Sequence, residues 1–342
     1  MTLIYKARVP TNIAFLKYWG KSDATQQWPA NDSLSMTLDL YSETLASREP
    51  LPAQAGAYAF SSDQALTASE AFLHKGLRHL QWLAAQLDFS ERIYLHTRNE
   101  FPASCGIASS ASGLGSLTLA ALACWTQSSS LSQLASCGFT RERIAQLARA
   151  GSGSACRSFW GGFVHWQRGE TAQTQSVLPL ASQDHWDLRD TIVIVSTQEK
   201  LISSSQGHRL APTSVQFVPR LARLPARLAE FQTAILQKNI RQLGQLLEEE
   251  ALEMHAVMAS SQPPCVYMSE ATQTFLQFLQ EIRVQKALPI YFTLDAGPNV
   301  HLIYEARHQE AVASLLKTYQ TIDVGISSGP SLGTETAQDG HH

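Results

Sequence analysis

The stretch Phe101–Gly115, FPASCGIASSASGLG, limits most strongly how this chain can fold. Its small residues lead into an apolar segment, Leu117–Trp125, which predicts a loop followed by a buried helix. A helix beginning near Ser109 would aim its free N–H groups and the positive end of its dipole at the loop. This pattern suits a phosphate cradle, although a Ser/Ala-rich loop that only caps a core helix is the alternative. It is not a Walker loop, because no Gly-Lys-Ser/Thr follows at the required spacing.

Composition narrows the function classes that need to be considered. The 342 residues are 44% hydrophobic and 16% charged, which is typical of a globular protein, and a net charge of -3 argues against a general nucleic-acid or membrane binder. We expect no signal peptide, and no apolar run reaches about 18 residues, so no membrane span is expected. The five cysteines are odd in number and form no CxxC, so we expect neither disulfides nor structural zinc, and a reducing cytoplasm.

Two lysines near the N-terminus stand among apolar residues. The segment PTNIAFLKYWGK, residues 10–21, brings Asn12, Lys17, Tyr18 and Lys21 together. If it is helical, the lysines share one face and repel each other, an arrangement that makes sense with an anion between them. A solvated lysine face is the alternative. The preceding residues 3–9 are expected to form a strand that Pro10 ends.

A second glycine-rich stretch, GSGSACRS, carries Ser152, Ser154 and Arg157. It follows an amphipathic helix expected over residues 140–150, with Thr140 as N-cap and Gly151 as the stop. The planar guanidinium suits carboxylate or phosphate oxygens, and small neighbours let backbone N–H groups converge on the same ligand. A flexible turn with a surface arginine is the alternative. In the strand that is expected next, His165 is interpreted as structural.

The C-terminal half contains one carboxylate in an unusual place. Asp295 ends an apolar strand, residues 290–294, and begins the turn DAGPN, so partial desolvation would let it act as a base. A turn-forming aspartate is the alternative. Upstream, the strand 191–196 leads into a polar loop with Lys200, Ser203 and Ser204, which suits closure over phosphates or is a plain solvent loop.

The remaining periodicity predicts a mixture of strands and helices. Alternating hydrophobicity predicts strands over residues 29–40, 93–97 and 300–304, and spacing of three to four predicts helices over 69–86, 131–138, 222–247, 251–259 and 272–284. No internal repeat and no low-complexity segment are evident.

Taken together and in this order, five motifs resemble one known family. TNIAFLKYWGK, FPASCGIASSASG, GSGSACRS, QPP and DAGPN are similar to the mevalonate diphosphate decarboxylases of the GHMP kinase superfamily, from about Ala7 to about Gly329. KYWGK with GSGSACRS and DAGPN is characteristic of the decarboxylase branch. The resemblance implies an α+β GHMP kinase fold with an N-terminal ribosomal-S5-like lobe (residues 1–185), a C-terminal ferredoxin-like lobe (186–330), a tail (331–342) and a cleft between the lobes.

The resemblance also implies a reaction. ATP phosphorylates the tertiary 3-hydroxyl of (R)-5-diphosphomevalonate, and loss of that phosphate with CO2 gives isopentenyl diphosphate in the mevalonate pathway of isoprenoid biosynthesis. Mg²⁺ is expected to arrive with ATP rather than on protein ligands. The implied partners are a small-molecule substrate and a second copy in a homodimer.

The family pattern assigns roles to matching residues. Asp295 matches the essential aspartate near the 3-hydroxyl, Lys17 the lysine that contacts the transferring phosphate, and Arg157 the arginine that anchors the substrate. Asn12 matches the asparagine that orients this arginine. Positions that bind substrate match Tyr18, Lys21, Ser152 and Ser154, and positions around ATP match Ser104, Gly106, Ile107, Ala108, Ser109, Ser110, Lys200, Ser203 and Ser204.

Four residues depart from the family pattern. His165 stands where Glu is usual, His208 where Met often follows the glycine, Cys105 where Ala is common, and Asp32 where Ser or Asn is common. None belongs to the Asp–Lys–Arg set, whose presence favours decarboxylation. The alternatives are a phosphomevalonate decarboxylase, a mevalonate 3-kinase and a non-catalytic nucleotide-binding protein.

Overall fold

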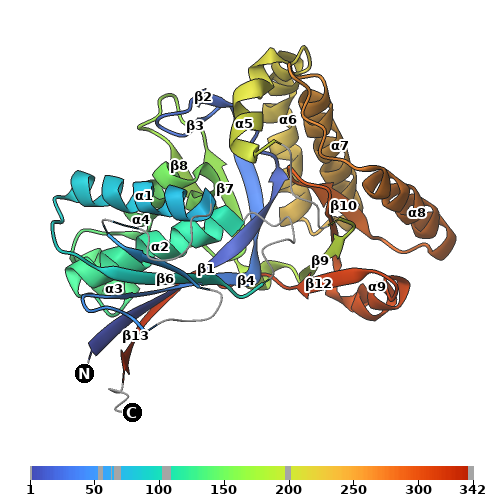
Figure 1. Ribbon diagram of the computed structural model, residues 1–342. Coiled ribbons are helices and arrows are strands. Elements are labelled where there is room, and N and C mark those ends of the chain that lie inside the picture. Colours follow the sequence, from blue (N-terminus) through green and yellow to red (C-terminus); the bar gives the residue numbers. More distant parts are fainter. Residues whose placement is uncertain are drawn as a thin grey trace.

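The computed structural model describes residues 2–52, 57–62, 64, 71–101, 109–196 and 202–337. These residues form two lobes, each with an antiparallel sheet and covering helices, and the first lobe carries both chain ends (Figure 1). Within these ranges, no helix has the length and apolar character needed to cross a bilayer.

The first sheet is organised around the long strand β4 (Ser33–Ser47). Strand β1 (Thr2–Leu16) pairs with one edge of β4, and β7 (Phe163–Gln167) and β6 (Tyr94–Asn99) share the other edge. The sheet is completed by β5 (Tyr58–Ser61), β8 (Ser176–Ala181) and β13 (Ser331–Ala337). Residues 331–337, expected to belong to a tail, therefore pair with β1 as an edge strand.

Strand β1 is longer than the sequence predicts. It continues through Pro10 to Leu16, with a register shift between Pro10 and Thr11. A proline is tolerated at such an irregularity because the missing N–H is not needed there. The expected stop at Pro10 was wrong. The condition under which Lys17 and Lys21 would share one helix face is not met, because residues 17–20 are not helical and lead into the short hairpin of β2 (Lys21–Asp23) and β3 (Trp28–Pro29).

The buried helix expected after the glycine-rich loop is α2 (Ser109–Thr126), and it lies against β1 and β4. Its serines are satisfied inside the core, since Ser112 Oγ bonds Ser42 Oγ at 2.7 Å and Ser116 Oγ bonds Thr44 Oγ1 at 2.8 Å. Helices α1 (Ala71–Leu87), α3 (Leu131–Ser136) and α4 (Arg141–Gly151) cover it. Thr140 caps α4 as predicted, accepting from Arg143 N.

The second sheet has the order β10-β11-β9-β12. Its strands are β9 (Leu188–Ile194), β10 (Tyr291–Leu294), β11 (Val300–Glu305) and β12 (Gln320–Val324). The helices of this lobe are α5 (Ser204–Leu210), α6 (Phe217–Leu236), α7 (Ile240–Ala259), α8 (Glu270–Lys286) and α9 (Gln309–Leu315). They confirm a mixed α+β architecture.

Two predictions in this lobe, one of a helix and one of a loop, were wrong. The segment 222–247 is not one helix: α6 ends at Leu236, Lys238 adopts a left-handed backbone with φ 54°, and Asn239 caps α7. The polar loop after β9 is helical from Ser204 onward. Ser203 and Gln206 form a capping box there, a sequence signal that the spacing S-x-x-Q carries.

The two lobes share one hydrophobic core. Phe15 from β1 and Met36 from β4 pack in the same buried cluster as Phe231 from α6 and Ile303 from β11. Leu302, the neighbour of Ile303, faces the other side of the second sheet and packs with α8 and α9. The C-terminal end of β1 is therefore held between the lobes, which places the residues that follow it at their junction.

The imidazole of His79 is buried against α2, so the dependence of stability on pH tests the packing of α1 on α2. Thr118 Oγ1 donates to Leu114 O at 2.7 Å, so it accepts from His79 Nε2, 2.8 Å away, and burial lowers the pKa of His79 to about 3. Below the ordinary histidine pKa of about 6.5 the unfolded chain takes up a proton that the folded chain refuses. We expect this residue to lower the free energy of unfolding by about 1.4 kcal/mol per pH unit between about pH 6 and pH 4.

Urea denaturation of His79→Leu at pH 7, 6 and 5 measures this effect. As the pH falls, the free energy of unfolding should decrease less steeply for the variant than for the parent, and the difference in slope should correspond to the uptake of about one proton. His74→Leu on the exposed face of α1 is the matched control and should keep the parental slope. Equal slopes for the parent and His79→Leu would contradict the assignment.

Candidate functional site

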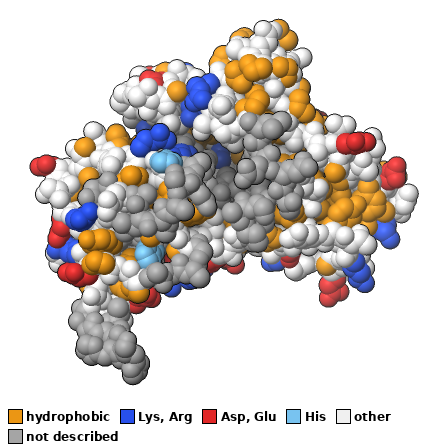
Figure 2. Space-filling view, in the orientation of Figure 1, with side chains coloured by type: hydrophobic (Ala, Val, Ile, Leu, Met, Phe, Trp, Pro, Cys, Tyr) orange, Lys and Arg blue, Asp and Glu red, His pale blue; other side chains and the backbone are white. Residues whose placement is uncertain are grey.

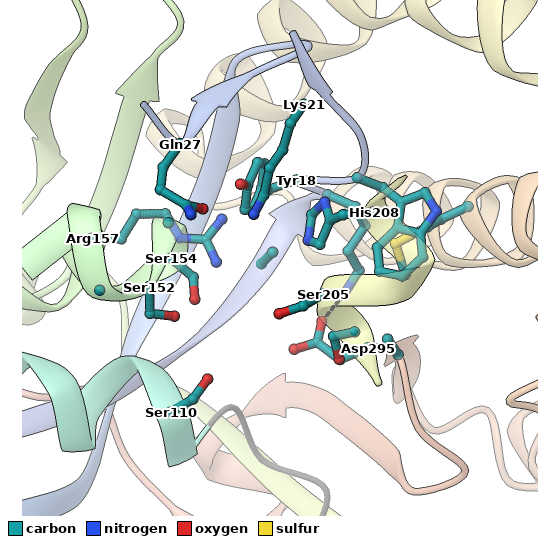
Figure 3. A pocket seen from close by; sticks show the side chains of 18 of the residues that line it. Tyr18, Lys21, Gln27, Ser110, Ser152, Ser154, Arg157, Ser205, His208 and Asp295 are labelled. Atoms are coloured by element: carbon teal, nitrogen blue, oxygen red, sulfur yellow. Dashed lines mark hydrogen bonds and ion pairs between the residues drawn. The ribbon is translucent and has the colours of Figure 1, made fainter. Parts of the chain in front are cut away.

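A cavity of about 250 Å³ lies at the junction of the lobes, and segments far apart in the sequence line it (Figure 3). The turn after β1 contributes Lys17 and Tyr18, the 3₁₀ helix at Gly153–Phe159 contributes Arg157, and the turn after β10 contributes Asp295. Lys21, Ser152, Ser154, Ser110 and Ser204 also line it. The structure therefore brings together most of the site residues that the sequence predicted.

Lys17 and Asp295 form an ion pair across the junction, with Nζ and Oδ1 2.9 Å apart. The Lys17 side chain is 1% exposed and that of Asp295 is 26% exposed. Burial raises the pKa of Asp295, but the nearby charges of Lys17, His301 and Arg157 outweigh it, so the net pKa lies below the usual value. Burial lowers the pKa of Lys17, and Asp295 opposes that shift. The pair keeps a carboxylate ionised beside the cavity.

The backbone of Asp295 is also held in place. Its carbonyl oxygen accepts from Gly297 N at 2.8 Å and bonds His255 Nε2 at 3.1 Å. Burial lowers the pKa of His255 to about 4, so the ring is neutral and donates from Nε2. Asn299 Oδ1 accepts from Val195 N and Ser196 N, which ties the turn to the end of β9.

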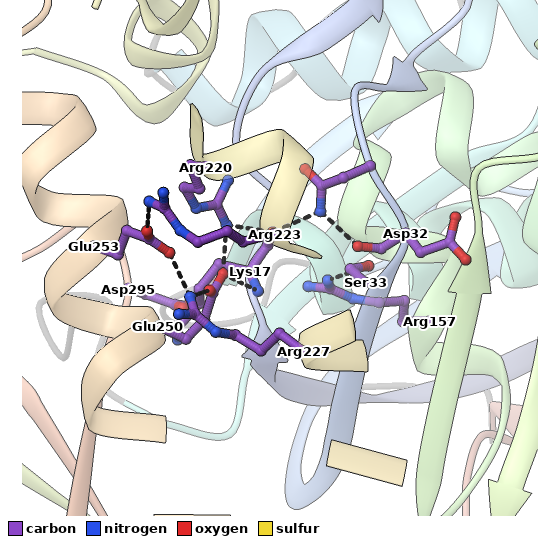
Figure 4. A network of polar contacts seen from close by, with 11 residues as sticks. Lys17, Asp32, Ser33, Arg157, Arg220, Arg223, Arg227, Glu250, Glu253 and Asp295 are labelled. Carbon is purple, nitrogen blue, oxygen red and sulfur yellow. Dashed lines mark hydrogen bonds and ion pairs between the residues drawn. The ribbon is translucent and has the colours of Figure 1, made fainter. Parts of the chain in front are cut away.

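A buried network clamps the main chain of Lys17 from the second lobe (Figure 4). Glu250 Oε1 accepts from Lys17 N at 3.1 Å, and Arg220 donates to Lys17 O at 3.1 Å. Arg220 and Glu250 are fully buried and bond each other, and Arg227 binds the second oxygen of Glu250 at 2.7 Å. Sequence reasoning missed this clamp, because nothing local in α6 or α7 signals a contact with residue 17.

Two acceptors orient the guanidinium of Arg157. Its Nε donates to Asn12 Oδ1 at 3.1 Å and its Nη1 to Ser33 Oγ at 3.0 Å. Asn12 in turn donates to Ser158 Oγ at 2.8 Å. The guanidinium is nearly buried, and these bonds leave Nη2 for the cavity, where an anionic oxygen could accept from it.

Two residues that depart from the family pattern are partners in the structure. His165 Nε2 lies 2.9 Å from Asp32 Oδ2, and Asp32 Oδ1 accepts from Arg168 N at 2.8 Å. Burial raises the pKa of Asp32, but the bonds from His165 and Arg168 lower it overall. Because Ser33 follows Asp32 and bonds Arg157, this pair supports the strand that orients the guanidinium.

The predicted nucleotide residues are only partly described. Ser104, Gly106, Ile107, Ala108 and Lys200 lie outside the described residues. Helix α2 begins at Ser109, as predicted, and Ser110 in its first turn borders the cavity. Ser203, which caps α5, is exposed and is absent from the cavity wall, whereas Ser204 lines it.

Sequence reasoning missed four polar residues of the wall: Gln27, Lys75, Ser205 and His208. Lys75 lies on α1, where it looks like an ordinary surface lysine in an amphipathic helix. Burial, together with the positive charges of Lys21 and Arg78, lowers the pKa of Lys75 to about 8. No local pattern indicates that α1 faces the cavity.

Positive charge dominates this region. The described wall carries four cationic side chains, Lys17, Lys21, Lys75 and Arg157, and one carboxylate, Asp295. An adjoining groove of about 870 Å³ shares Lys75 and adds Arg78, Arg143 and Arg149; blue side chains gather around the hollow in Figure 2. Such a site suits a ligand with several negative charges. Among the described residues, no group of three His, Cys, Asp or Glu side chains is placed to hold a metal ion.

Two family models match the two lobes. The diphosphomevalonate decarboxylase-like N-terminal domain matches residues 9–178, and the mevalonate 5-diphosphate decarboxylase C-terminal domain matches residues 191–334. Diphosphomevalonate decarboxylase of Ganoderma lucidum is 32% identical, covering 92% of this chain and 81% of the relative. That of Aspergillus fumigatus is 33% identical, covering 92% and 80%.

Solved structures agree with the sequence relatives. Mevalonate diphosphate decarboxylase from Staphylococcus aureus matches with a TM-score of 0.82 at 31% identity, covering 97% of this chain and 98% of that chain. A solved MDDEF complex with MVAPP, AMPPCP and magnesium matches with a TM-score of 0.84 at 29% identity, covering 97% and 99%. This chain belongs to the diphosphomevalonate decarboxylase family.

Proposed function

We propose that this chain catalyses the ATP-dependent decarboxylation of (R)-5-diphosphomevalonate to isopentenyl diphosphate, with ADP, phosphate and CO2 as the other products. One observation carries the proposal: the Lys17–Asp295 ion pair and the Arg157 guanidinium border one cavity. The curated relatives are diphosphomevalonate decarboxylases, and one solved relative was bound to MVAPP, AMPPCP and magnesium.

The charge of the cavity fits this substrate. A diphosphate and a carboxylate on one small molecule need several cations, and the wall supplies four. Tyr18, Lys21, Ser152 and Ser154 bind the diphosphate in this proposal. Arg157 holds the carboxylate, since its Nε and Nη1 are already committed to Asn12 and Ser33 and its remaining edge is free for the ligand.

The start of α2 fits the phosphates of ATP. The N-terminus of an 18-residue helix offers free N–H groups and positive dipole charge, and Ser110 there borders the cavity. We assign binding of the triphosphate to Ser104, Gly106, Ile107, Ala108 and Ser109, together with Lys200, Ser203 and Ser204. Mg²⁺, when bound with ATP, neutralises negative charge on the phosphates.

Asp295 orients the 3-hydroxyl for attack on the γ-phosphorus. Because Lys17, His301 and Arg157 lower the pKa of Asp295, this carboxylate is ionised and accepts the hydroxyl hydrogen bond, but it is a weak base. A loose phosphoryl-transfer transition state needs little proton removal beforehand, so positioning and charge stabilisation carry the step. The hydroxyl proton passes to Asp295 as the new O–P bond forms and ADP leaves. Lys17, next to Asp295, is placed to neutralise charge on the transferring group.

Decarboxylation follows from the loss of the 3-phosphate. As the C3–O bond breaks, positive charge grows at C3, and the electron pair of the bond to the carboxylate forms the new double bond as CO2 leaves. Arg157 fixes the carboxylate while Lys17 and Arg157 stabilise the departing phosphate.

We also propose that the chain forms a homodimer. Analytical sedimentation of the purified protein tests this proposal, because it measures the mass of the particle in solution.

The direct test is to incubate the protein with ATP and diphosphomevalonate and to measure ADP and CO2 together. Equal release of both supports the proposal. ADP without CO2 indicates a 3-kinase, and neither product indicates a nucleotide-binding protein. Parallel assays with the monophosphate distinguish a phosphomevalonate decarboxylase.

Asp295→Asn tests the carboxylate. The amide has the same size but no negative charge, so turnover should fall by about 10³-fold or more, while ATP affinity stays within about threefold. Steady-state kinetics and calorimetric ATP binding give the two values. Turnover within tenfold of the parent would overturn the role of Asp295.

Lys17→Met tests how the carboxylate stays ionised. Without the ammonium, burial raises the pKa of Asp295, so the acid limb of the pH–turnover profile should move to higher pH. Lys21→Met is the matched control, because it removes another cation of the same wall that is not bonded to Asp295. It should raise the KM for diphosphomevalonate and leave the acid limb of the profile at its parental pH. An unmoved acid limb in Lys17→Met would contradict the ion-pair argument.

A further inference from the structure

His208, on helix α5, stands in the cavity wall between two aromatic rings. Its ring centroid lies 4.4 Å from that of Tyr18 and 4.6 Å from that of Trp19, and Figure 3 shows it between Tyr18 and Ser205, facing the cavity. In the family pattern Met often stands at this position, and its side chain has no hydrogen-bond donor. The imidazole therefore adds a polar group that this chain does not share with that pattern.

The hydrogen bond at one nitrogen determines what the other nitrogen can do. Gly20 N donates to His208 Nδ1 at 3.0 Å, so Nδ1 carries a lone pair. In the neutral ring the proton is then on Nε2. Burial, together with the positive charges of Lys21, Arg157 and Lys75, lowers the pKa of His208 to about 3, so the ring is neutral at physiological pH. Nε2–H has no hydrogen-bond partner among the described residues, and the bond to Nδ1 is the one hydrogen bond of this ring there.

A second donor beside His208 also lacks a partner. The Tyr18 hydroxyl is buried and has no hydrogen-bond partner within the described part of the chain, and burial raises its pKa, so it is a neutral donor. A Cβ at Gly153 would lie 2.6 Å from Tyr18 Oη, so the glycine leaves the space in which this hydroxyl sits. Lys21 lines the same part of the cavity. This part of the wall thus holds an ammonium and two neutral donors that have no partner among the described residues, an arrangement that suits an acceptor-rich group.

His208 also holds the turn between Tyr18 and Lys21. Gly20 has φ +93°, and a Cβ there would lie 2.5 Å from the Phe217 ring, so only glycine fits. The bond from Gly20 N to His208 Nδ1 fixes the turn that carries Tyr18 and Lys21 to the cavity.

We propose that His208 is a substrate-binding residue that donates its Nε2–H to an oxygen of the diphosphate held by Tyr18 and Lys21. This inference rests on the proposed function. A neutral donor suits this position because the wall already carries four cations, and a further charge would repel them. The fixed tautomer donates only, so it binds oxygens that act as acceptors, as those of an ionised phosphate do.

Three substitutions separate the two nitrogens. His208→Asn keeps an acceptor near the Nδ1 position and removes the Nε2 donor. His208→Gln places an amide near the Nε2 position, and His208→Met removes both groups. Calorimetric titration without nucleotide measures binding of diphosphomevalonate and, separately, of inorganic diphosphate. Thermal unfolding of each variant verifies that the fold is kept, and His74→Asn on α1 is the histidine control outside this cavity.

His208→Asn and His208→Met should bind diphosphomevalonate about tenfold more weakly than the parent, because a bond to a charged oxygen is lost. His208→Gln should recover affinity to within about threefold. The KM for the substrate should rise in step with these values, while kcat and the KM for ATP stay within about twofold.

Parental affinity in folded His208→Asn would overturn the proposal and leave His208 with the structural role at Gly20 alone. A parent that binds inorganic diphosphate but not diphosphomevalonate would overturn the proposed substrate instead. In that case the affinity for inorganic diphosphate tests the role of His208. Equal affinity of the parent and His208→Asn refutes a donor role for Nε2, and tenfold weaker binding by the variant supports it.

Discussion

The ion pair between Lys17 and Asp295 is the interaction on which the rest of the site depends. A lysine that is 1% exposed loses its hydration, and only a carboxylate within bonding distance makes the charged form stable there. Each partner follows a strand of a different lobe, so the pair also joins the two sheets. Glu250 and Arg220 bond the main-chain N–H and carbonyl of Lys17, so the backbone from which the ammonium extends is held by the second lobe.

The cavity wall carries both charged and neutral hydrogen-bond donors, and the two kinds have different roles. Cations attract a polyanion and stabilise negative charge that moves during phosphoryl transfer. Each additional cation, however, lowers the pKa of its neighbours, as Lys75 shows. The neutral donors at Tyr18 and His208 add directed hydrogen bonds without this repulsion, and they are held by aromatic packing and by the turn at Gly20.

Local sequence signals predicted the fold where one segment decides its own structure. Thr140 caps α4, α2 begins at Ser109, and the DAGPN turn follows β10, because caps and turns depend on residues a few positions apart. The predictions failed where tertiary pairing outweighed a local preference. Strand β1 passes through Pro10 because β4 pairs with it on both sides of that residue, and the break between α6 and α7 at Lys238 has no strong breaker residue.

The sequence by itself determined the chemistry of the site: a lysine, an arginine and an aspartate in short motifs, with small residues around them. Only the tertiary structure decided which other groups join them. Lys75 and His208 line the cavity, and Glu250 accepts a hydrogen bond from the main chain of Lys17. These contacts join residues that lie far apart in the sequence. Such contacts depend on how two sheets and their helices pack, and periodicity along the chain reports only which face of an element is buried, not what that face meets.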